Sequence, residues 1–79
     1  MRYKDMAKAF ATILRRHRAQ KEITQETLAE RADIASKMVS LIERNERNPS
    51  LNVADSIAQG LGTSLAQMIK EAEALRKKH

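Results

Sequence analysis

Hydroxyl, amide and cationic side chains are concentrated between positions 24 and 48 of this sequence. If the stretch that begins at position 36 is helical, four side chains share its outward, leading part: Ser36, Lys37, Ser40 and Leu41. The chain has no glycine-rich phosphate loop and no recognisable pair of nucleophile and base. Its two histidines, His17 and His79, do not stand at a metal-ligand spacing. We therefore expect binding rather than catalysis, with no metal and no cofactor.

The four side chains carry the groups that read base edges in the major groove of DNA. The ammonium group of Lys37 would donate to guanine O6 or N7, and Leu41 would pack on a thymine methyl group. The serine hydroxyls would contact base edges or phosphates. The alternative is that Leu41 is an ordinary, partly exposed leucine and that Ser40 only supports the backbone. The formal net charge of +5 favours a polyanionic partner, although many soluble domains are basic for no special reason.

Two short helices that meet at a tight turn are predicted to position these residues. In the first of these helices, the apolar residues Leu28 and Ala32 lie about one helical turn apart, and in the second, Val39 and Ile42 do so. Between them, Asp33 tolerates the left-handed backbone that a sharp turn requires. The small side chain of Ala29 lets the two backbones approach. This is the helix-turn-helix pattern, whose second helix lies in the major groove.

The remaining apolar periodicity predicts three more helices and no strand, an all-α bundle of five helices. The first runs from residue 3 or 5 to 20, the second follows a Thr24 cap and ends near Ala32, and the third runs from 36 to 44 or 45. The fourth begins at a Ser50 or Asn52 cap and is ended by Gly60 and Gly62, and the fifth begins at a Thr63 or Ser64 cap. Leu51 is expected on the inner face of the fourth helix, together with Ala54, Ile57, Ala58 and Leu61.

Charged groups of the first helix fall on two different faces. Met6, Phe10, Ile13 and Leu14 form its apolar stripe. Arg18 continues this stripe, which places a charge on the inward face. Arg15 and Arg16 point elsewhere and are expected to be solvated, and His17 is expected to be a polar surface residue.

The totals fit one small domain, a DNA-binding unit that spans residues 1–79. There is no cysteine, and Tyr3 and Phe10 are the only aromatic residues. The core must therefore be small and aliphatic, which suggests that burial in a dimer supplies part of the stability. No apolar run approaches the roughly 18 residues of a membrane span, and the charged start is no secretory signal. We expect a cytoplasmic protein with no membrane partner.

The stretch TQETLAERADIASKMVSLIERNERNPSL resembles the Cro and lambdoid phage-repressor family, the Xre-type helix-turn-helix domains. The matching residues are Thr24, Gln25, Leu28, Ala29, Val39, Ser40, Ile42, Glu43, Arg44, Pro49, Ser50 and Leu51. The resemblance implies a five-helix bundle that binds operator DNA, usually as a two-fold dimer. Asp33 and Asn45 replace glycines that are common in the family. Ala35 replaces the usual cap of the recognition helix, so that this cap is lost or passes to Ser36.

The resemblance also implies roles for residues around the two short helices. Gln25 would clamp a phosphate beside the recognition helix, where helix amides favour an anion, or would be a solvated first-turn residue. Apart from the resemblance, a polar cluster beyond that helix is suited by its side chains to the flanking phosphates: Arg44, Asn45, Arg47 and Asn48. Glu46 in their midst argues against all four contacting DNA together. Arg18 and Glu43 would form a buried ion pair with a structural role.

The apolar stripe of the fifth helix is longer than one small domain needs. Leu65 and Ile69 are expected to close the core. Met68, Ala72 and Leu75 would then remain exposed, and we predict that they form the dimer interface. The alternative is that this helix frays after about Lys70.

The leading functional hypothesis is a sequence-specific transcriptional regulator that binds an inverted-repeat operator in double-stranded DNA as a homodimer. The alternative is an antitoxin-type interaction module, in which the basic surface neutralises an acidic partner protein. RNA binding is a third hypothesis, against which the near absence of aromatic residues for base stacking counts.

Overall fold

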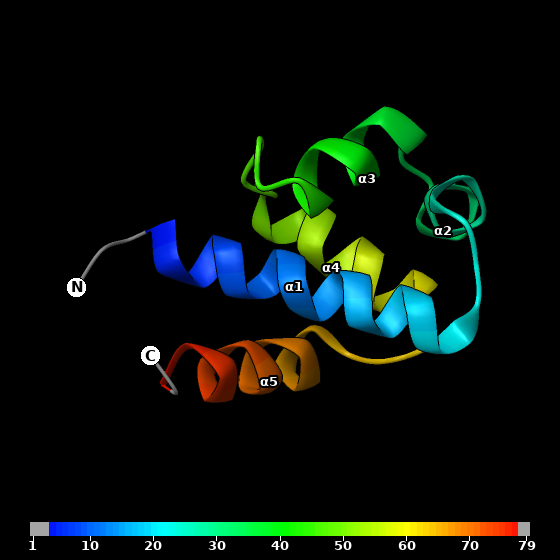
Figure 1. Cartoon of the computed structure of the whole chain (residues 1–79). Helices are drawn as coiled ribbons and strands as arrows, with labels where there is room; N and C mark the ends of the chain where they lie inside the picture. Colours follow the sequence, from blue (N-terminus) through cyan, green and yellow to red (C-terminus); the bar gives the residue numbers. More distant parts are fainter. Residues whose placement is uncertain (1–3, 78–79) are drawn as a thin grey trace.

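The computed structural model describes residues 4–77, which form five α-helices and no strand within that range (Figure 1). The helices are α1 (Lys4–Lys21), α2 (Gln25–Ala32), α3 (Ser36–Glu43), α4 (Leu51–Gly60) and α5 (Leu65–Lys77). The predicted all-α class and the predicted number of helices are confirmed. Helix α1 packs along α5 and also against α3, while α2 packs against α3 and α4. Among the described helices, none combines the length and the apolar composition that a membrane crossing requires.

Side-chain caps explain where three of the helices begin. The Thr24 hydroxyl accepts the backbone N–H of Thr27 at 3.0 Å and starts α2. Ser50 and Ser64 start α4 and α5 in the same way, and neither Asn52 nor Thr63 is the cap. Helix α3 begins after Ala35 without a side-chain cap. The cap that the family usually has at this position is therefore lost, and Ser36 does not replace it.

Left-handed backbone marks four of the turns. Asp33, with φ of 58°, ends α2 and gives the sharp bend that leads to α3. Asn45 follows α3 with the same φ, and Gly62 follows α4 with φ of 74°. The fourth position, Glu22 with φ of 54°, follows α1 and carries none of the residue types that favour this backbone. The residue types therefore did not predict this turn.

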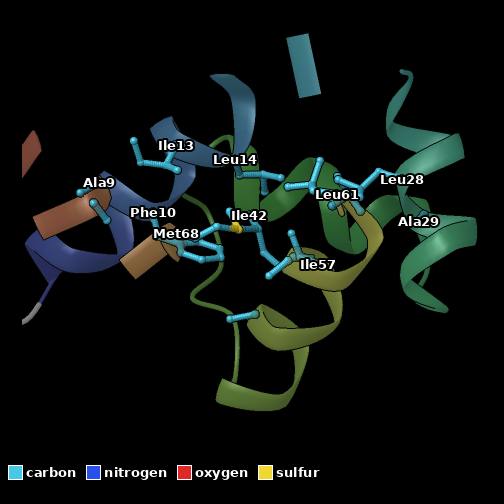
Figure 2. Close-up of a cluster of buried hydrophobic side chains, with 14 residues drawn as sticks. Ala9, Phe10, Ile13, Leu14, Leu28, Ala29, Ile42, Ile57, Leu61 and Met68 are labelled. Carbon is cyan, nitrogen blue, oxygen red and sulfur yellow. The ribbon is translucent and has the colours of Figure 1, made fainter. Parts of the chain in front are cut away.

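The core lies where α1, α4 and α5 meet the inner faces of α2 and α3 (Figure 2). Its fully buried large side chains are Leu14, Leu28, Val39, Ile42, Ile57, Leu61 and Met68. Gly60 lies in the last turn of α4 and allows that helix to approach α2 closely. A Cβ atom there would lie 3.1 Å from Leu28 Cδ1 and 3.2 Å from the Ala32 backbone nitrogen. Gly60 thus serves packing, whereas Gly62 makes the turn.

Burial corrects two expectations about apolar residues. Leu51 is 76% exposed at the start of α4, so its placement on the inner face was wrong. Met68 and Ala72 are both 0% exposed, so the prediction that they remain free on α5 was also wrong. Helix α5 lies along α1 (Figure 1). Both residues belong to the core cluster, and Figure 2 shows Met68 among the buried side chains. The helix continues to Lys77 and does not end near residue 70.

The remaining apolar residues of α5 are neither fully buried nor free. Leu65, Ile69 and Leu75 are half-buried and pack at the margin of the core. Of the predicted dimer residues, only Leu75 therefore keeps exposed surface. Two residues named above, Tyr3 and His79, lie outside the described part of the chain.

Candidate nucleic-acid interface

Helix α3 lies at the outside of the bundle and presents its first turn to solvent (Figure 1). Ser36 and Lys37 are exposed, while Ser40 and Leu41 are half-buried. On the opposite face, Val39 is 0% and Ile42 is 1% exposed, which fixes the helix to the core. Within residues 4–77, the side chain of Lys37 makes no hydrogen bond or ion pair, so its ammonium group is free to meet another molecule.

The end of α3 is closed by two backbone hydrogen bonds. The N–H of Asn45 donates to the Ile42 carbonyl at 3.0 Å, and the N–H of Glu46 donates to the Leu41 carbonyl at 2.8 Å. With Asn45 in the left-handed conformation, this is a Schellman motif. It allows the chain to leave the helix abruptly, directly after the exposed face.

The polar cluster after α3 is exposed, as a phosphate-binding surface would need to be. Arg44, Asn45, Arg47 and Asn48 are all accessible to solvent. Glu46 pairs with Arg44, whose Nε atom lies 3.3 Å from Glu46 Oε2. Arg47, in contrast, forms no ion pair with a carboxylate among the described residues, so its charge is not offset.

Arg18 and Glu43 form the ion pair that the family resemblance implies. Arg18 Nε donates to Glu43 Oε2 at 2.6 Å, and Nη2 donates to Oε1 at 3.0 Å. The third nitrogen, Nη1, donates to the Ile23 carbonyl at 3.0 Å. The Glu43 side chain is 4% exposed and that of Arg18 is 26% exposed. The hydrogen bond to Glu43 raises the pKa of Arg18 above its ordinary value, so this guanidinium is permanently charged.

Gln25 turns toward this ion pair rather than toward solvent. Its Nε2 atom donates to Glu43 Oε1 at 3.0 Å, and the side chain is half-buried. The interpretation of Gln25 as a solvated first-turn residue was therefore wrong. The Nε2 group has a second N–H that Glu43 does not occupy, so a phosphate beside α2 would meet this N–H or the backbone N–H groups of the first turn.

Arg15 also contacts the end of α3, although the sequence predicted a solvated side chain. Its Nη1 atom donates to the backbone carbonyl of Glu43, and Nη2 donates to Thr12 Oγ1 at 3.1 Å. The side chain is exposed, but its head group is bound. The signal that could have revealed it is position, because Arg15 precedes Arg18 by three residues and so lies on nearly the same face of α1.

Comparison with known proteins identifies the family. A sequence model described as helix-turn-helix matches residues 14–68. The chain belongs to the helix-turn-helix family of transcriptional regulators. An uncharacterized HTH-type transcriptional regulator of Methanothermobacter thermautotrophicus is 39% identical over 51 residues, which cover 65% of this chain and 74% of that protein. A second one, y4dJ of Sinorhizobium fredii, is 32% identical over 65 residues, 82% of this chain and 84% of its own length.

Solved structures agree with this assignment. The crystal structure of the wild-type restriction-modification controller protein C.Esp1396I superposes with a TM-score of 0.87 at 25% identity, and all of both chains is covered. Family membership places this chain among Xre-type DNA-binding transcriptional regulators and not among enzymes. In such a helix-turn-helix protein, α2 and α3 are the two helices of the motif and α3 is the recognition helix.

A second polar contact lies away from α3 and joins α1 to α5. His17 Nε2 lies 2.7 Å from Glu71 Oε1, and Gln67 Nε2 donates to Glu71 Oε2 at 2.7 Å. The hydrogen bond from Gln67 and, after it, the one from His17 lower the pKa of Glu71. The His17 side chain is only 16% exposed. The expectation of an ordinary surface histidine was therefore wrong, and His17 helps to hold α5 in place.

Proposed function

We propose that this helix-turn-helix regulator binds a specific inverted-repeat operator as a homodimer. The observation that carries the proposal is the division of α3 into two faces. One face is anchored by buried Val39, Ile42 and Glu43, and the other presents Ser36 and Lys37, which are exposed. A cationic group on a rigid, projecting helix is suited to donate to the guanine edge in the major groove.

The contacts we assign follow the exposure of each side chain. Ser36, Lys37, Ser40 and Leu41 would face the bases, and the two half-buried members of this set would contact them only at their outer atoms. Arg47 and Asn48 would contact the flanking phosphates, with Arg44 and Asn45 beside them. Gln25 would contact a phosphate through the second N–H of its side-chain amide, beside the backbone N–H groups at the start of α2. The net charge of +5 supports binding to a polyanion, and a cytoplasmic location accompanies this function.

The test is selection of bound sites from a pool of random double-stranded DNA. We expect enrichment of an inverted repeat whose half-site centres lie about 10 base pairs, or a multiple of that, apart. Binding should weaken steeply as the salt concentration rises, because bound phosphates release counterions. Failure to enrich any sequence, together with tight capture of a partner protein in the absence of DNA binding, would refute the proposal and favour the antitoxin-type alternative.

We still propose that α5 forms the dimer interface, but with fewer of its apolar residues than the sequence suggested. Leu75 keeps exposed surface there, whereas Met68 and Ala72 are used within the monomer. A two-fold contact near Leu75 would bury the same surface twice and could set the two recognition helices about 34 Å apart. Leu51 is the competing site, because it is the one large apolar side chain that is mostly exposed in the described structure.

Sedimentation of two charged variants separates these sites. Leu75→Glu should shift the protein from dimer toward monomer at micromolar concentration, and Leu51→Glu should leave the dimer intact. Leu51→Glu should not harm the fold, since its side chain is already in water. The opposite pattern would move the interface to the start of α4. Monomeric wild-type protein at every concentration that binds the operator would refute the homodimer.

A further inference from the structure

The last carbonyl groups of α3 are satisfied from three different sources. A helix leaves its final carbonyls without partners inside the helix. The amides of Glu46 and Asn45 satisfy those of Leu41 and Ile42. The carbonyl of Glu43, the last helical residue, accepts instead from the guanidinium of Arg15 on α1. Helix α3 has no basic residue of its own in its last turn, and Arg15 adds a cation at the negative end of the helix dipole, beside the cap residue Arg44.

The guanidinium of Arg15 is itself held in position. Thr12, three residues earlier on α1, accepts from Arg15 Nη2 at 3.1 Å. The Thr12 hydroxyl donates in turn to the Lys8 carbonyl at 3.3 Å. A planar guanidinium that is bound on two sides has a fixed direction, which a flexible exposed side chain would not have.

Arg15 and Arg18 therefore hold Glu43 at two separate points. Arg18 binds its carboxylate, and Arg15 binds its backbone carbonyl. A single attachment through a side chain restrains where the end of the helix lies but leaves rotation about the side-chain bonds. A second attachment to the backbone restrains the direction of the helix axis as well. Lys37 lies on this same helix, so the direction of its side chain depends on that axis.

We propose that Arg15, held by Thr12, is a positioning residue that sets the orientation of the recognition helix against α1 and thereby sharpens base selection. The proposal rests on the DNA-binding function proposed above. It assigns Arg15 a role that differs from a phosphate contact, which an exposed arginine on a DNA-binding protein would otherwise be expected to make. The two roles have different signatures in binding experiments. Loss of a phosphate contact weakens all sequences alike, whereas loss of orientation weakens the operator selectively.

The experiment compares Arg15→Gln with Arg16→Gln. Both remove one positive charge from neighbouring positions of α1, but the side chain of Arg16 is exposed and makes no hydrogen bond or ion pair within residues 4–77. Affinities for the selected operator and for random DNA are measured across a salt series. Arg15→Gln should lower the ratio of operator to random-DNA affinity on the order of tenfold, the scale of one charge-assisted hydrogen bond. Arg16→Gln should leave that ratio unchanged, and the salt slopes of the two variants should agree.

Thr12→Val gives an independent arm because it changes no charge. It removes the oxygen that orients Arg15, so it should lower the same ratio in the same direction, by less, with the wild-type salt slope. The proposal is overturned if Arg15→Gln loses affinity equally for operator and random DNA, with a salt slope lower than that of Arg16→Gln by about one. In that case Thr12→Val should have no effect on either affinity.

Hydrogen exchange of the free protein separates this proposal from the function on which it rests. In Arg15→Gln, the amides of Arg44, Asn45 and Glu46 should exchange faster than in Arg16→Gln, because the end of α3 is less firmly held. Unchanged exchange would refute the positioning role even if the wild-type protein binds DNA. Faster exchange in a protein that binds no DNA would instead refute the proposed function.

Discussion

Removal of Arg18 should be more damaging than removal of its partner Glu43. In Arg18→Met, the carboxylate of Glu43 is left with the single hydrogen bond from Gln25, at a site where its side chain is 4% exposed. An unpaired charge at such a site costs on the order of 3–5 kcal/mol. In Glu43→Gln, the charge disappears from the buried side. Arg18 keeps its hydrogen bond to the Ile23 carbonyl and its 26% exposure to water, so the cost should be about 1–3 kcal/mol.

The double variant Arg18→Met with Glu43→Leu should recover much of this loss. Apolar side chains of similar size replace both charges. The polar groups that then lose a partner are the Gln25 amide and the Ile23 carbonyl, and both residues are only partly buried. Replacing a buried ion pair in this way is often neutral or stabilising. We therefore expect the losses of the single variants to be strongly non-additive.

Urea unfolding of the wild type, the single variants and the double variant measures this interaction as a double-mutant cycle. Equal, additive losses of a few tenths of a kcal/mol would refute the reasoning, since that is the behaviour of two independent surface charges.

Three further predictions address other parts of the molecule. Lys37→Ala should cost about 1–3 kcal/mol at one operator position and relax base preference there; a uniform loss across base variants in a binding assay would make Lys37 a phosphate contact. Gly60→Ala should destabilise the fold by about 1–3 kcal/mol. The added Cβ would lie 3.2 Å from the Ala32 backbone nitrogen, which cannot move aside as a side chain could. Urea unfolding measures this loss, and Gln59→Ala, at an exposed position, is the control. Glu71→Gln tests the contact between α1 and α5 through its pH dependence. The pKa of Glu71 is lower in the folded chain than in the unfolded one, so its contribution is present above the unfolded value and is lost as the pH falls through the folded value. The variant should thus be less stable than the wild type at pH 7 by under about 1 kcal/mol, since the side chain is partly exposed. The difference should shrink as the pH falls below the unfolded pKa of a glutamate and be lost below the folded pKa. A difference that persists in strong acid would contradict this reasoning.

Local signals were sufficient for the helices and for the turn between α2 and α3. The Thr24 hydroxyl and the left-handed Asp33 each act within a few residues of their own position, so residue type and spacing predict them. At Ala35 the sequence left open whether the cap is lost or passes to Ser36, and the structure shows that it is lost. The pairing of Arg18 with Glu43 was also accessible. A charge that continues the apolar stripe of a helix needs a partner of opposite sign, and the family resemblance names that partner.

Contacts between helices decided what the sequence left open. Periodicity shows that α5 has a wide apolar stripe, but it does not show which edge of that stripe faces the bundle. Only the packing of α5 along α1 buries Met68 and leaves Leu75 partly exposed. The pairing of His17 with Glu71 spans 54 positions of the chain, and no local pattern predicts it.

The end of α3 shows most clearly that residue types alone do not predict contacts between helices. Arg15 donates to a backbone carbonyl, and every residue has such a carbonyl, so residue types alone cannot identify which one is left without a partner. Gln25 likewise turns toward Glu43 because the buried carboxylate has an oxygen to satisfy, and not because of any preference of glutamine at the start of a helix. Residue type thus predicts which groups must find partners, and the tertiary structure decides which partners they find.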